Sequence, residues 1–446
     1  MDFFGERGGS LTCEGVALRA IAREAGTPCF VYSRRTLEHH YDRIVEAFPG
    51  VDLLACYSVK GNSNLAVLDV LRRKGSGFDV VSGGELLRVL RVGADPRRVV
   101  FAGVGKTAEE MRAALDAGIL MFNVESPAEL DLLERVARAR RRVADLALRV
   151  NPDVDPRTHT YISTGKRESK FGIDLEAARA LAAGLPRRKW LRMVGVHAHI
   201  GSQITEVAPH VEAVGKVVAF ARDARAAGNP VTALNAGGGF GVHYRGGEAR
   251  PAKEFGDALA PLVRAAGLRL LLEPGRFIAG NAGVLVARVI LVKESGDRRF
   301  VVVDAAMNDL LRPALYGAHH RVWPVRAPFP EAEAASRPAS ETWTCDVVGP
   351  VCETGDFLAK DRRLPPVASG DLLCVYTAGA YGMTMSSNYN ARPRAAEVMV
   401  DGRRWQVVRD RERAEELFRG ERVLRPATRR RRPRRRPARR RARTRR

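Results

Sequence analysis

Eight short apolar runs recur about every 30 residues between residues 51 and 276, and each is followed by a segment with helical spacing. The runs are rich in Val, Leu and Phe and are too short to be helices, as expected for strands of a parallel sheet that is buried on both faces. They are VDLLACYSVK (51–60), GFDVVSG (77–83), RVVFAG (98–103), LMFNVES (120–126), ADLALRVNP (144–152), MVGVHAHIGS (193–202), TALNAGGGF (232–240) and LRLLLEPGR (268–276).

The stretches between these runs carry the signals of amphipathic helices. Thr107 with Glu110, and Ser126 with Glu129, have the spacing of a capping box at a helix start. Eight strands alternating with helices over about 225 residues predict an α/β fold of the (β/α)8 TIM-type barrel. A doubly wound open sheet is the alternative, but eight regular units favour a closed barrel.

The rhythm changes after Gly280. Strand-like runs follow with no long helix between them, and the Asp401-Gly402 pair inside the last run is typical of a type I′ hairpin turn. We therefore expect a C-terminal mostly-β domain after the barrel. The predicted parts are an N-terminal segment at 1–30 that joins the β domain, the barrel at 31–280, the β domain at 281–421 and an arginine-rich tail at 422–446.

Most of the positive charge lies in this tail. The formal net charge of the chain is +23, and residues 425–446 contain 14 Arg and no acidic residue, which leaves +9 for the rest. We expect the tail to be a disordered, solvated extension without function. The alternative is binding of a polyanion such as nucleic acid, which would be non-specific because no aromatic residue is present to stack on bases.

The remaining composition is typical of a large folded protein. Hydrophobic residues make up 45% of the chain, which excludes general disorder. No apolar run approaches the ~18 residues needed to span a bilayer, and the N-terminus lacks the pattern of a secretory signal. The cysteines form no CxxC pair, so we expect a cytoplasmic protein with reduced thiols.

Active sites of such barrels lie at the carboxyl ends of the strands. In this chain several predicted strands end in side chains that could act in catalysis or bind a ligand. Lys60 ends the first run; when desolvated by its neighbours it can form a Schiff base, and a surface lysine is the alternative. His197 and His199 end the sixth run and, as alternate residues of a strand, should face the same way. The further ligands of a metal site are missing, so we expect no metal. His199 is interpreted as a ring stacked on a planar cofactor, and His197 as a buried structural residue.

The seventh and eighth runs end in residues suited to an anion and a ring nitrogen. Gly237, Gly238 and Gly239 can present bare backbone N–H groups to a phosphate, with a flexible turn as the alternative. Glu273 can pair with a protonated ring nitrogen and Arg276 can bind a phosphate, unless the two form a structural ion pair. A Schiff-base lysine, a stacking ring, a phosphate cradle and a partner for a pyridinium nitrogen together predict a pyridoxal 5′-phosphate site.

With these residues the chain resembles the fold-type III pyridoxal-phosphate decarboxylases, from about residue 10 to residue 420. Segments in both predicted domains carry the resemblance, and only the arginine tail falls outside it. They are YSVKGN (57–62), DVVSGGEL (79–86), ESKFGI (168–173), GVHAHIGSQI (195–204), NAGGGFG (235–241), EPGR (273–276), MNDLLRPALYGAHH (307–320), CETGD (352–356) and GAYGMTMSSNYN (379–390).

The resemblance implies roles for individual residues. Lys60 would carry the cofactor, His199 would stack on its ring and Glu273 would face the ring nitrogen. The residues near the phosphate would be Ser202, Gly237, Gly238, Gly239, Gly275 and Arg276. The substrate contacts would be Arg276, Arg312, Tyr316, Glu353 and Tyr381, with Tyr381 also touching the cofactor. Cys352 would be the proton donor.

The resemblance also implies an assembly and a substrate. In this family Cys352 and Glu353 reach the site of the neighbouring subunit, so a homodimer with composite active sites is expected. The expected reaction converts meso-2,6-diaminopimelate to L-lysine and CO2, the last step of lysine biosynthesis. This amino-acid substrate keeps an amino-carboxylate at its far end, which Arg312 and Glu353 fit. Decarboxylation of ornithine, arginine or carboxynorspermidine remains the alternative.

Overall fold

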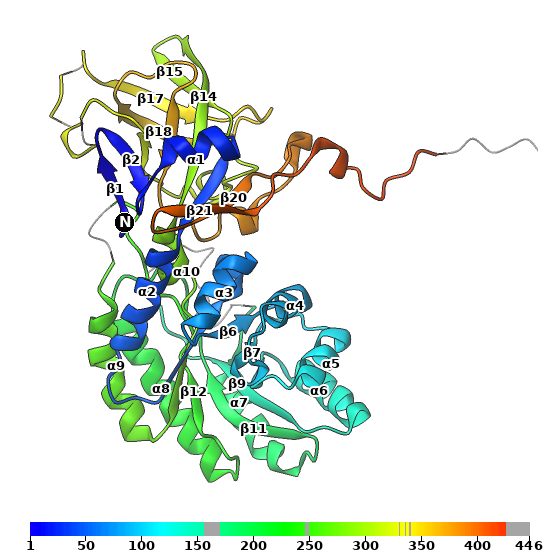
Figure 1. The fold of residues 1–446 in the computed structure, drawn as a ribbon. Coiled ribbons are helices and arrows are strands. Elements are labelled where there is room, and N and C mark those ends of the chain that lie inside the picture. The colour runs from blue at the N-terminus through cyan, green and yellow to red at the C-terminus, as the bar shows by residue number, and fades with distance from the viewer. Residues whose placement is uncertain (156–169, 246–248, 330, 335, 339, 425–446) are drawn as a thin grey trace, which may run out of the picture.

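The computed structural model describes residues 1–155, 170–245, 249–329, 331–334, 336–338 and 340–424. Figure 1 shows a barrel with a β domain beyond one of its ends. The predicted tail lies outside the described residues from residue 425 onward, and so do Glu168 and Ser169 of the ESKFGI segment. In the part of the chain that is described, every helix is too short or too polar to cross a membrane.

Eight parallel strands form the barrel. They are β5 (Leu53–Ser58), β6 (Gly77–Val80), β7 (Val99–Phe101), β8 (Met121–Val124), β9 (Ala144–Asn151), β11 (Leu191–His197), β12 (Ala233–Asn235) and β13 (Arg269–Leu272). Seven of the eight predicted runs contain one of these strands, and the sixth run overlaps β11, which begins two residues earlier at Leu191. A short strand, β10 (Ile173–Asp174), pairs in parallel with the last two residues of β9. β13 pairs with β5, with Leu271 opposite Leu54, and this pairing closes the ring. The barrel prediction is therefore confirmed, and an open sheet, which would leave two unpaired edges, is excluded.

Amphipathic helices cover the outside of the barrel because each presents one apolar face to the strands. They are α2 (Arg34–Glu46), α3 (Leu65–Arg73), α4 (Gly83–Arg91), α5 (Ala108–Ala117), α6 (Pro127–Arg140), α7 (Leu175–Gly184), α8 (Ala208–Ala226) and α9 (Ala252–Ala266).

The predicted capping boxes differ in outcome. At α5 both halves are present, because Thr107 Oγ1 accepts from Glu110 N at 3.2 Å and Glu110 Oε2 accepts from Thr107 N at 2.9 Å. At α6 the Ser126 side chain caps the helix, but Glu129 bonds the backbone N–H of the preceding residue, Glu125, rather than that of Ser126. The reason is electrostatic: Glu129 turns toward the buried ammonium of Lys106, 2.6 Å away.

The β domain follows the barrel in the chain, as predicted. Its strands are β14 (Gly283–Ser295), β15 (Arg298–Val303), β16 (Val322–Pro324), β17 (Trp343–Val348), β18 (Phe357–Leu364), β19 (Leu372–Val375), β20 (Ala396–Asp401) and β21 (Arg404–Arg409). The N-terminal segment contributes β4 (Cys29–Ser33), which lies between β14 and β20 and extends three residues past the predicted boundary at residue 30. Its first residues form a small sheet of β1 (Phe4–Arg7), β2 (Ser10–Cys13) and β3 (Val16–Ala17), followed by α1 (Leu18–Ala25).

The hairpin predicted at Asp401-Gly402 is present, but its turn is displaced by one residue. Asp401 pairs with Arg404, so the turn consists of Gly402 and Arg403. Gly402 has a φ of +64°, whereas Arg403 is not among the residues with positive φ. A type I′ turn needs positive φ at both central positions, which an arginine disfavours, so the predicted turn type is wrong.

The two domains share a continuous hydrophobic core. The chain passes from one to the other through α10 (Arg276–Ala279) and a short turn, η5 (Gly280–Ala282), directly into β14. Because β13 ends just before α10, the carboxyl ends of the barrel strands face the β domain (Figure 1). Residues of both domains therefore surround the mouth of the barrel.

Candidate active site

A cavity of about 700 Å³ lies where the mouth of the barrel meets the β domain. Its size is within the usual range for sites that hold a cofactor-sized ligand. Ten of the predicted site residues line it: Lys60, His199, Ser202, Gly239, Glu273, Gly275, Arg276, Arg312, Tyr316 and Tyr381. Gly237, Gly238, Cys352 and Glu353 do not.

Lys60 lies in a short helical turn, η1 (Val59–Gly61), directly after β5. Its Nζ is 2.9 Å from Asp79 Oδ2 on the neighbouring strand β6, and that oxygen also accepts a 2.5 Å hydrogen bond from Ser58 Oγ. Burial opposes the charge of the amine, but Asp79 and, more weakly, Tyr381 and Glu273 raise the pKa of Lys60 above its ordinary value. Asp79 therefore outweighs the desolvation that would favour the neutral amine.

Glu273 follows β13 and is buried. Its Oε1 accepts hydrogen bonds from Asn235 Nδ2 at 2.7 Å and from Asn123 Nδ2 at 3.2 Å. Burial opposes the charge of this carboxylate, but His197 and Lys60 outweigh it and hold the pKa of Glu273 well below its usual range. An ionised carboxylate that lines the cavity can keep a proton on a ring nitrogen of a ligand.

The two histidines of the sixth run lie in different places. His197 is the last residue of β11 and is fully buried in the barrel, with Nε2 3.5 Å from Glu273 Oε1. His199 lies beyond the strand and lines the cavity. Among the described residues, no three His, Cys, Asp or Glu side chains are grouped so that they could hold a metal ion.

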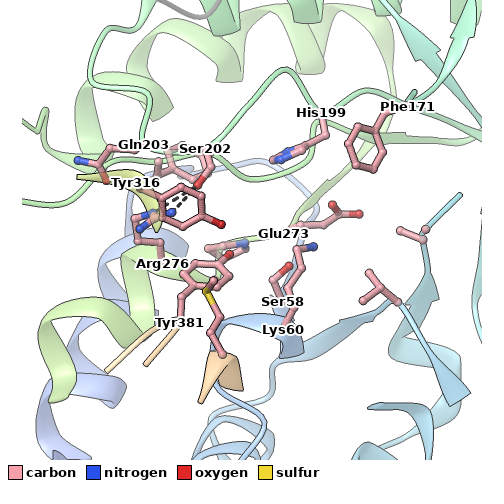
Figure 2. Close-up of a pocket in the computed structure, with 18 of the residues that line it drawn as sticks. Ser58, Lys60, Phe171, His199, Ser202, Gln203, Glu273, Arg276, Tyr316 and Tyr381 are labelled. Atoms are coloured by element: carbon pink, nitrogen blue, oxygen red, sulfur yellow. Dashed lines mark hydrogen bonds between the residues drawn. The ribbon is translucent and has the colours of Figure 1, made fainter. Parts of the chain in front are cut away.

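The ring of His199 is neutral. Gly238 N–H donates to His199 Nδ1 at 3.1 Å, so Nδ1 is the acceptor and the proton lies on Nε2. Burial lowers the pKa of His199 well below its ordinary value, and the positive charges of Arg149 and Lys60 lower it further. Figure 2 shows His199 beside Phe171 on one side of the cavity, above Glu273 and Lys60. A flat neutral ring at this place can pack against a planar ligand.

The glycine loop after β12 does not present three free N–H groups. Gly237 N donates to Asn235 Oδ1 at 2.9 Å, and Gly238 N donates to His199. Both groups are used inside the protein, and only Gly239 of the three lines the cavity. The predicted cradle is thus reduced to Gly239, with Gly275 as a second glycine on the cavity wall.

These glycines are required by close backbone approaches. A Cβ on Gly238 would lie 2.2 Å from the carbonyl oxygen of Glu273, and one on Gly239 would lie 2.5 Å from that of Gly201. A Cβ on Gly275 would meet the Ser58 side chain at 2.9 Å. Larger residues would push the loops apart and displace Glu273, so the glycines also set the shape of the cavity.

Arg276, the first residue of α10, lies at one side of the cavity. Its Nη2 donates to Ser202 Oγ at 2.9 Å and its Nη1 donates to Tyr244 Oη at 2.6 Å. Figure 2 shows the guanidinium between Ser202, Tyr316 and Tyr381, and its carbon lies 4.8 Å from the centre of the Tyr381 ring.

A second guanidinium belongs to Arg312, the first residue of α11 (Arg312–Tyr316). It contacts His320 Nε2 at 2.7 Å and lies over the Tyr244 ring. Arg312 and Arg276 are both buried, and neither forms an ion pair with a carboxylate of the described residues. Buried cations without such partners favour anionic ligands in the cavity.

Asp79, Tyr244 and His320 were not predicted as site residues. Asp79 lies near the carboxyl end of a barrel strand, so the strand-end rule could have found it. Tyr244 follows the glycine loop, and His320 ends the segment RPALYGAHH. No sequence pattern marks either position as a site residue. Tyr244 contacts Arg276 on another element, and His320 contacts Arg312 eight residues earlier, so each is recognised only from its contact in the fold.

Cys352 and Glu353 lie outside the cavity of their own chain. Cys352 is exposed, and its backbone N–H donates to Asn390 Oδ1 at 2.8 Å. Glu353 Oε2 accepts a hydrogen bond from Tyr389 Oη at 3.3 Å. The two predicted residues therefore do not meet the other ten within one chain.

The residues of the cavity fit pyridoxal 5′-phosphate. The guanidinium of Arg276, which has no carboxylate partner among the described residues, suits a phosphate together with Ser202 and the bare backbone of Gly275. The Lys60 amine suits a carbonyl, and the ionised Glu273 suits a protonated ring nitrogen. These side chains follow different barrel strands, and together they match the phosphate, the carbonyl and the ring nitrogen of one cofactor.

Comparisons with known proteins agree with this chemistry. Residues 34–280 match the family model described as "Pyridoxal-dependent decarboxylase, pyridoxal binding domain". The diaminopimelate decarboxylase of Pseudomonas aeruginosa is 49% identical over 424 residues, which cover 95% of this chain and 100% of that protein. The enzyme of the same name from Vibrio cholerae is 48% identical, with 95% and 100% covered.

Solved structures give the same result. The diaminopimelate decarboxylase of Helicobacter pylori, complexed with L-lysine, superposes with a TM-score of 0.85 at 38% identity, covering 90% of this chain and 98% of that one. The diaminopimelate decarboxylase of M. jannaschii, also in complex with L-lysine, has a TM-score of 0.88 at 34% identity, covering 95% and 98%.

Proposed function

We propose that this chain, which belongs to the pyridoxal-dependent decarboxylases and within them to the diaminopimelate decarboxylases, converts meso-2,6-diaminopimelate to L-lysine and CO2. It is a carboxy-lyase of lysine biosynthesis. The observation that carries this function is that one cavity brings together the Lys60 amine, the Glu273 carboxylate and two buried guanidinium groups that have no carboxylate partner in the described part of the chain.

The cofactor of this reaction is pyridoxal 5′-phosphate, which supplies an electron sink for the bond that breaks when CO2 leaves. In this proposal Lys60 binds it covalently through the amine, and Glu273 keeps the ring nitrogen protonated. His199 packs against the ring, and being neutral it adds no charge beside the Glu273 carboxylate. Arg276 binds the phosphate together with Ser202, Gly239 and Gly275.

The remaining cavity residues account for the substrate. Arg312 is the guanidinium available for the carboxylate that diaminopimelate retains, and Tyr316 and Tyr381 line the cavity beside it. Ornithine and arginine end in a cation instead, which two buried guanidinium groups would repel. The charge of the cavity thus favours a substrate with a carboxylate at each end.

The exposed pair Cys352 and Glu353 is assigned to a neighbouring subunit. We propose a homodimer in which the partner subunit's Glu353 binds the far amine of the substrate. The partner subunit's Cys352 delivers a proton to the carbon that lost its carboxyl group. The exposure of Cys352 supports this role, because a surface thiol is available to another chain. All six thiols are free, which suits a cytoplasmic enzyme.

The substrate is tested by measuring CO2 release from diaminopimelate, ornithine, arginine and carboxynorspermidine with purified protein. We expect release from diaminopimelate to exceed the others by at least ~100-fold in kcat/KM. A preference for ornithine or arginine would overturn the proposal.

The cofactor assignment is tested by absorbance. The purified protein should show a visible band that borohydride bleaches, and Lys60→Ala should lack it. Lys253→Ala, which changes a lysine far more exposed than Lys60, is the matched control and should keep the band. A bleachable band in Lys60→Ala would contradict the role of this lysine.

A further inference from the structure

Two buried arginines share one tyrosine in the cavity. Tyr244 Oη accepts a 2.6 Å hydrogen bond from Arg276 Nη1, and the Arg312 guanidinium lies 4.7 Å from the centre of the Tyr244 ring. Arg276 is farther from the same ring, at 5.9 Å. Both arginines are less than a tenth exposed, at 7% and 6%. Two like charges at this depth repel each other, and Tyr244 is in contact with both.

Tyr244 contacts the two arginines through different parts of its side chain. Its hydroxyl oxygen serves Arg276 by accepting a charge-assisted hydrogen bond. Its ring face serves Arg312 through the negative charge of the π system. The two interactions can therefore be removed separately, because the first needs the oxygen and the second needs only the ring.

His320 adds the second support of Arg312. Its Nδ1 lies 2.8 Å from the carbonyl oxygen of Tyr376, which can only accept, so Nδ1 carries the proton. Nε2 is then free to accept from Arg312 Nη1 at 2.7 Å. Burial and the charge of Arg312 lower the pKa of His320 to about 3, so the ring stays neutral at ordinary pH. The His320 and Tyr244 rings also form a T-shaped contact, with centroids 5.4 Å apart and an interplanar angle of 78°.

We infer that Tyr244 and His320 are positioning residues that hold the two guanidinium groups at separate places in the cavity. The Tyr244 hydroxyl keeps Arg276 with Ser202, where the phosphate binds. The Tyr244 ring and His320 keep Arg312 available for the carboxylate that the substrate retains. This inference rests on the proposed function, which states what each arginine binds.

The conservative variant Tyr244→Phe tests the first half, because it removes the oxygen and keeps the ring. We expect the dissociation constant of pyridoxal 5′-phosphate, measured by titrating the apoprotein, to rise ~10-fold or more. The KM for diaminopimelate at saturating cofactor should stay within ~3-fold. Tyr41→Phe is the matched control, since Tyr41 is a buried tyrosine of α2 that does not line the cavity.

The variant His320→Phe tests the second half, because it keeps a ring beside Tyr244 and removes the acceptor of Arg312. Here the cofactor dissociation constant should stay within ~3-fold and the KM should rise ~10-fold, with kcat changed less. A readout without turnover is the binding of L-lysine, which keeps one carboxylate, relative to cadaverine, which keeps none. We expect His320→Phe to reduce this preference ~10-fold and Tyr244→Phe to leave it unchanged.

The inference is supported if Tyr244→Phe weakens only cofactor binding and His320→Phe weakens only the binding of the substrate carboxylate. A cofactor dissociation constant in Tyr244→Phe within twofold of the wild type would overturn the role of the hydroxyl. Equal weakening of L-lysine and cadaverine by His320→Phe would show that His320 acts only on general stability. If that variant does not fold, His320→Gln, which keeps an acceptor, must retain the preference, and its loss would likewise overturn the role.

Failure of the proposed function gives a different result. A wild-type protein that does not release CO2 from diaminopimelate would contradict the reaction. The cofactor titration of Tyr244→Phe would still measure how much the hydrogen bond between Tyr244 and Arg276 contributes to cofactor binding, because the titration needs no substrate. The two hypotheses can therefore fail independently.

Discussion

The charge of the individual residues in the cavity is set by neighbours on other strands. Lys60 remains protonated because Asp79 lies 2.9 Å away, although burial alone would favour the neutral amine. Asp79 in turn is buried, and burial and Glu273 raise its pKa. Lys60 opposes that rise, so each of the two groups favours the charged form of the other against burial.

Replacing Asp79 with Asn should lower the pKa of Lys60 in the apoprotein by about 1–3 units, because burial then acts without the opposing carboxylate. The value can be measured by 13C NMR of reductively methylated lysines, with Lys60→Ala to assign the signal. Ser58→Ala removes another partner of Asp79 without removing charge and should change the Lys60 pKa much less. An unchanged pKa in Asp79→Asn would contradict this account of the ion pair.

Among the elements, close backbone approaches decide how helices and loops pack around the barrel. α9 crosses the end of α2 so closely that a Cβ on Gly256 would lie 1.7 Å from the carbonyl oxygen of Ala47. α8 is bonded to the glycine loop, because His210 Nε2 lies 3.1 Å from the carbonyl oxygen of Gly238. His210 also stacks on Phe240 at 5.5 Å. Elements behind the cavity thereby hold its wall in place.

Gly256→Ala should reduce the free energy of unfolding by about 1–3 kcal/mol or more, because α9 must move away from α2. Gly215→Ala is the matched control: Gly215 lies in α8 with no atom near its missing Cβ, and alanine there should stabilise by about 0.5–1 kcal/mol. Urea denaturation followed by circular dichroism measures both. A neutral Gly256→Ala variant would mean that the two helices separate at little cost.

The pH dependence of stability should report on His210. Burial lowers the pKa of His210 to about 4, from an ordinary value of 6.5. The neutral ring therefore stabilises the fold fully above pH 6.5, and this contribution, of the order of 3 kcal/mol, is lost as the pH falls from 6.5 toward 4.

His210→Gln keeps a donor for the Gly238 carbonyl but cannot titrate, so its stability should fall less between pH 7 and pH 4 than that of the wild type. Urea denaturation at several pH values gives the comparison. Other titrating groups such as His320 are common to both proteins and cancel. Parallel pH profiles would show that His210 does not contribute in this way.

For the whole molecule, one chain supplies the residues proposed to hold the cofactor and leaves two other proposed site residues outside the cavity. The barrel and the β domain together contribute Lys60, Glu273, Arg312 and Tyr381 to one cavity. Cys352 and Glu353, by contrast, lie outside it. In the proposed homodimer only the dimer is active, because each subunit contributes Cys352 and Glu353 to the active site of the other.

Mixing two inactive variants tests this exchange. Lys60→Ala and Cys352→Ala should each lose activity, but after exchange of subunits about a quarter of the sites should be intact, because one site of each mixed dimer has both residues. Lys60→Ala mixed with Glu273→Ala should recover nothing, since both residues come from the same subunit. Recovery in the control, or none in the test pair, would contradict the composite site. The assay is CO2 release after the subunits are mixed and separated from aggregates.

Patterns of short range determined the architecture and the places where chemistry occurs. Alternating apolar runs and helical spacing are local, so they predicted the eight strands, the following β domain and the strand ends that carry Lys60, Glu273 and Arg276. Local patterns gave wrong predictions where a residue from another element formed the hydrogen bond or ion pair instead. Glu129 was drawn away from its cap by Lys106, and the N–H groups of the glycine loop were taken up by side chains.

The tertiary structure alone decided which side chains meet. Lys60 and Asp79 are 19 residues apart, Asn123 and Glu273 are 150 apart, and their contacts depend on which strands are neighbours in the closed ring. The same holds for Tyr244, which joins an arginine of the barrel end to one of the β domain. Hydrogen bonds and charge interactions act over a few ångströms in space, so protonation states and the orientation of the arginines follow from folding and not from spacing along the chain.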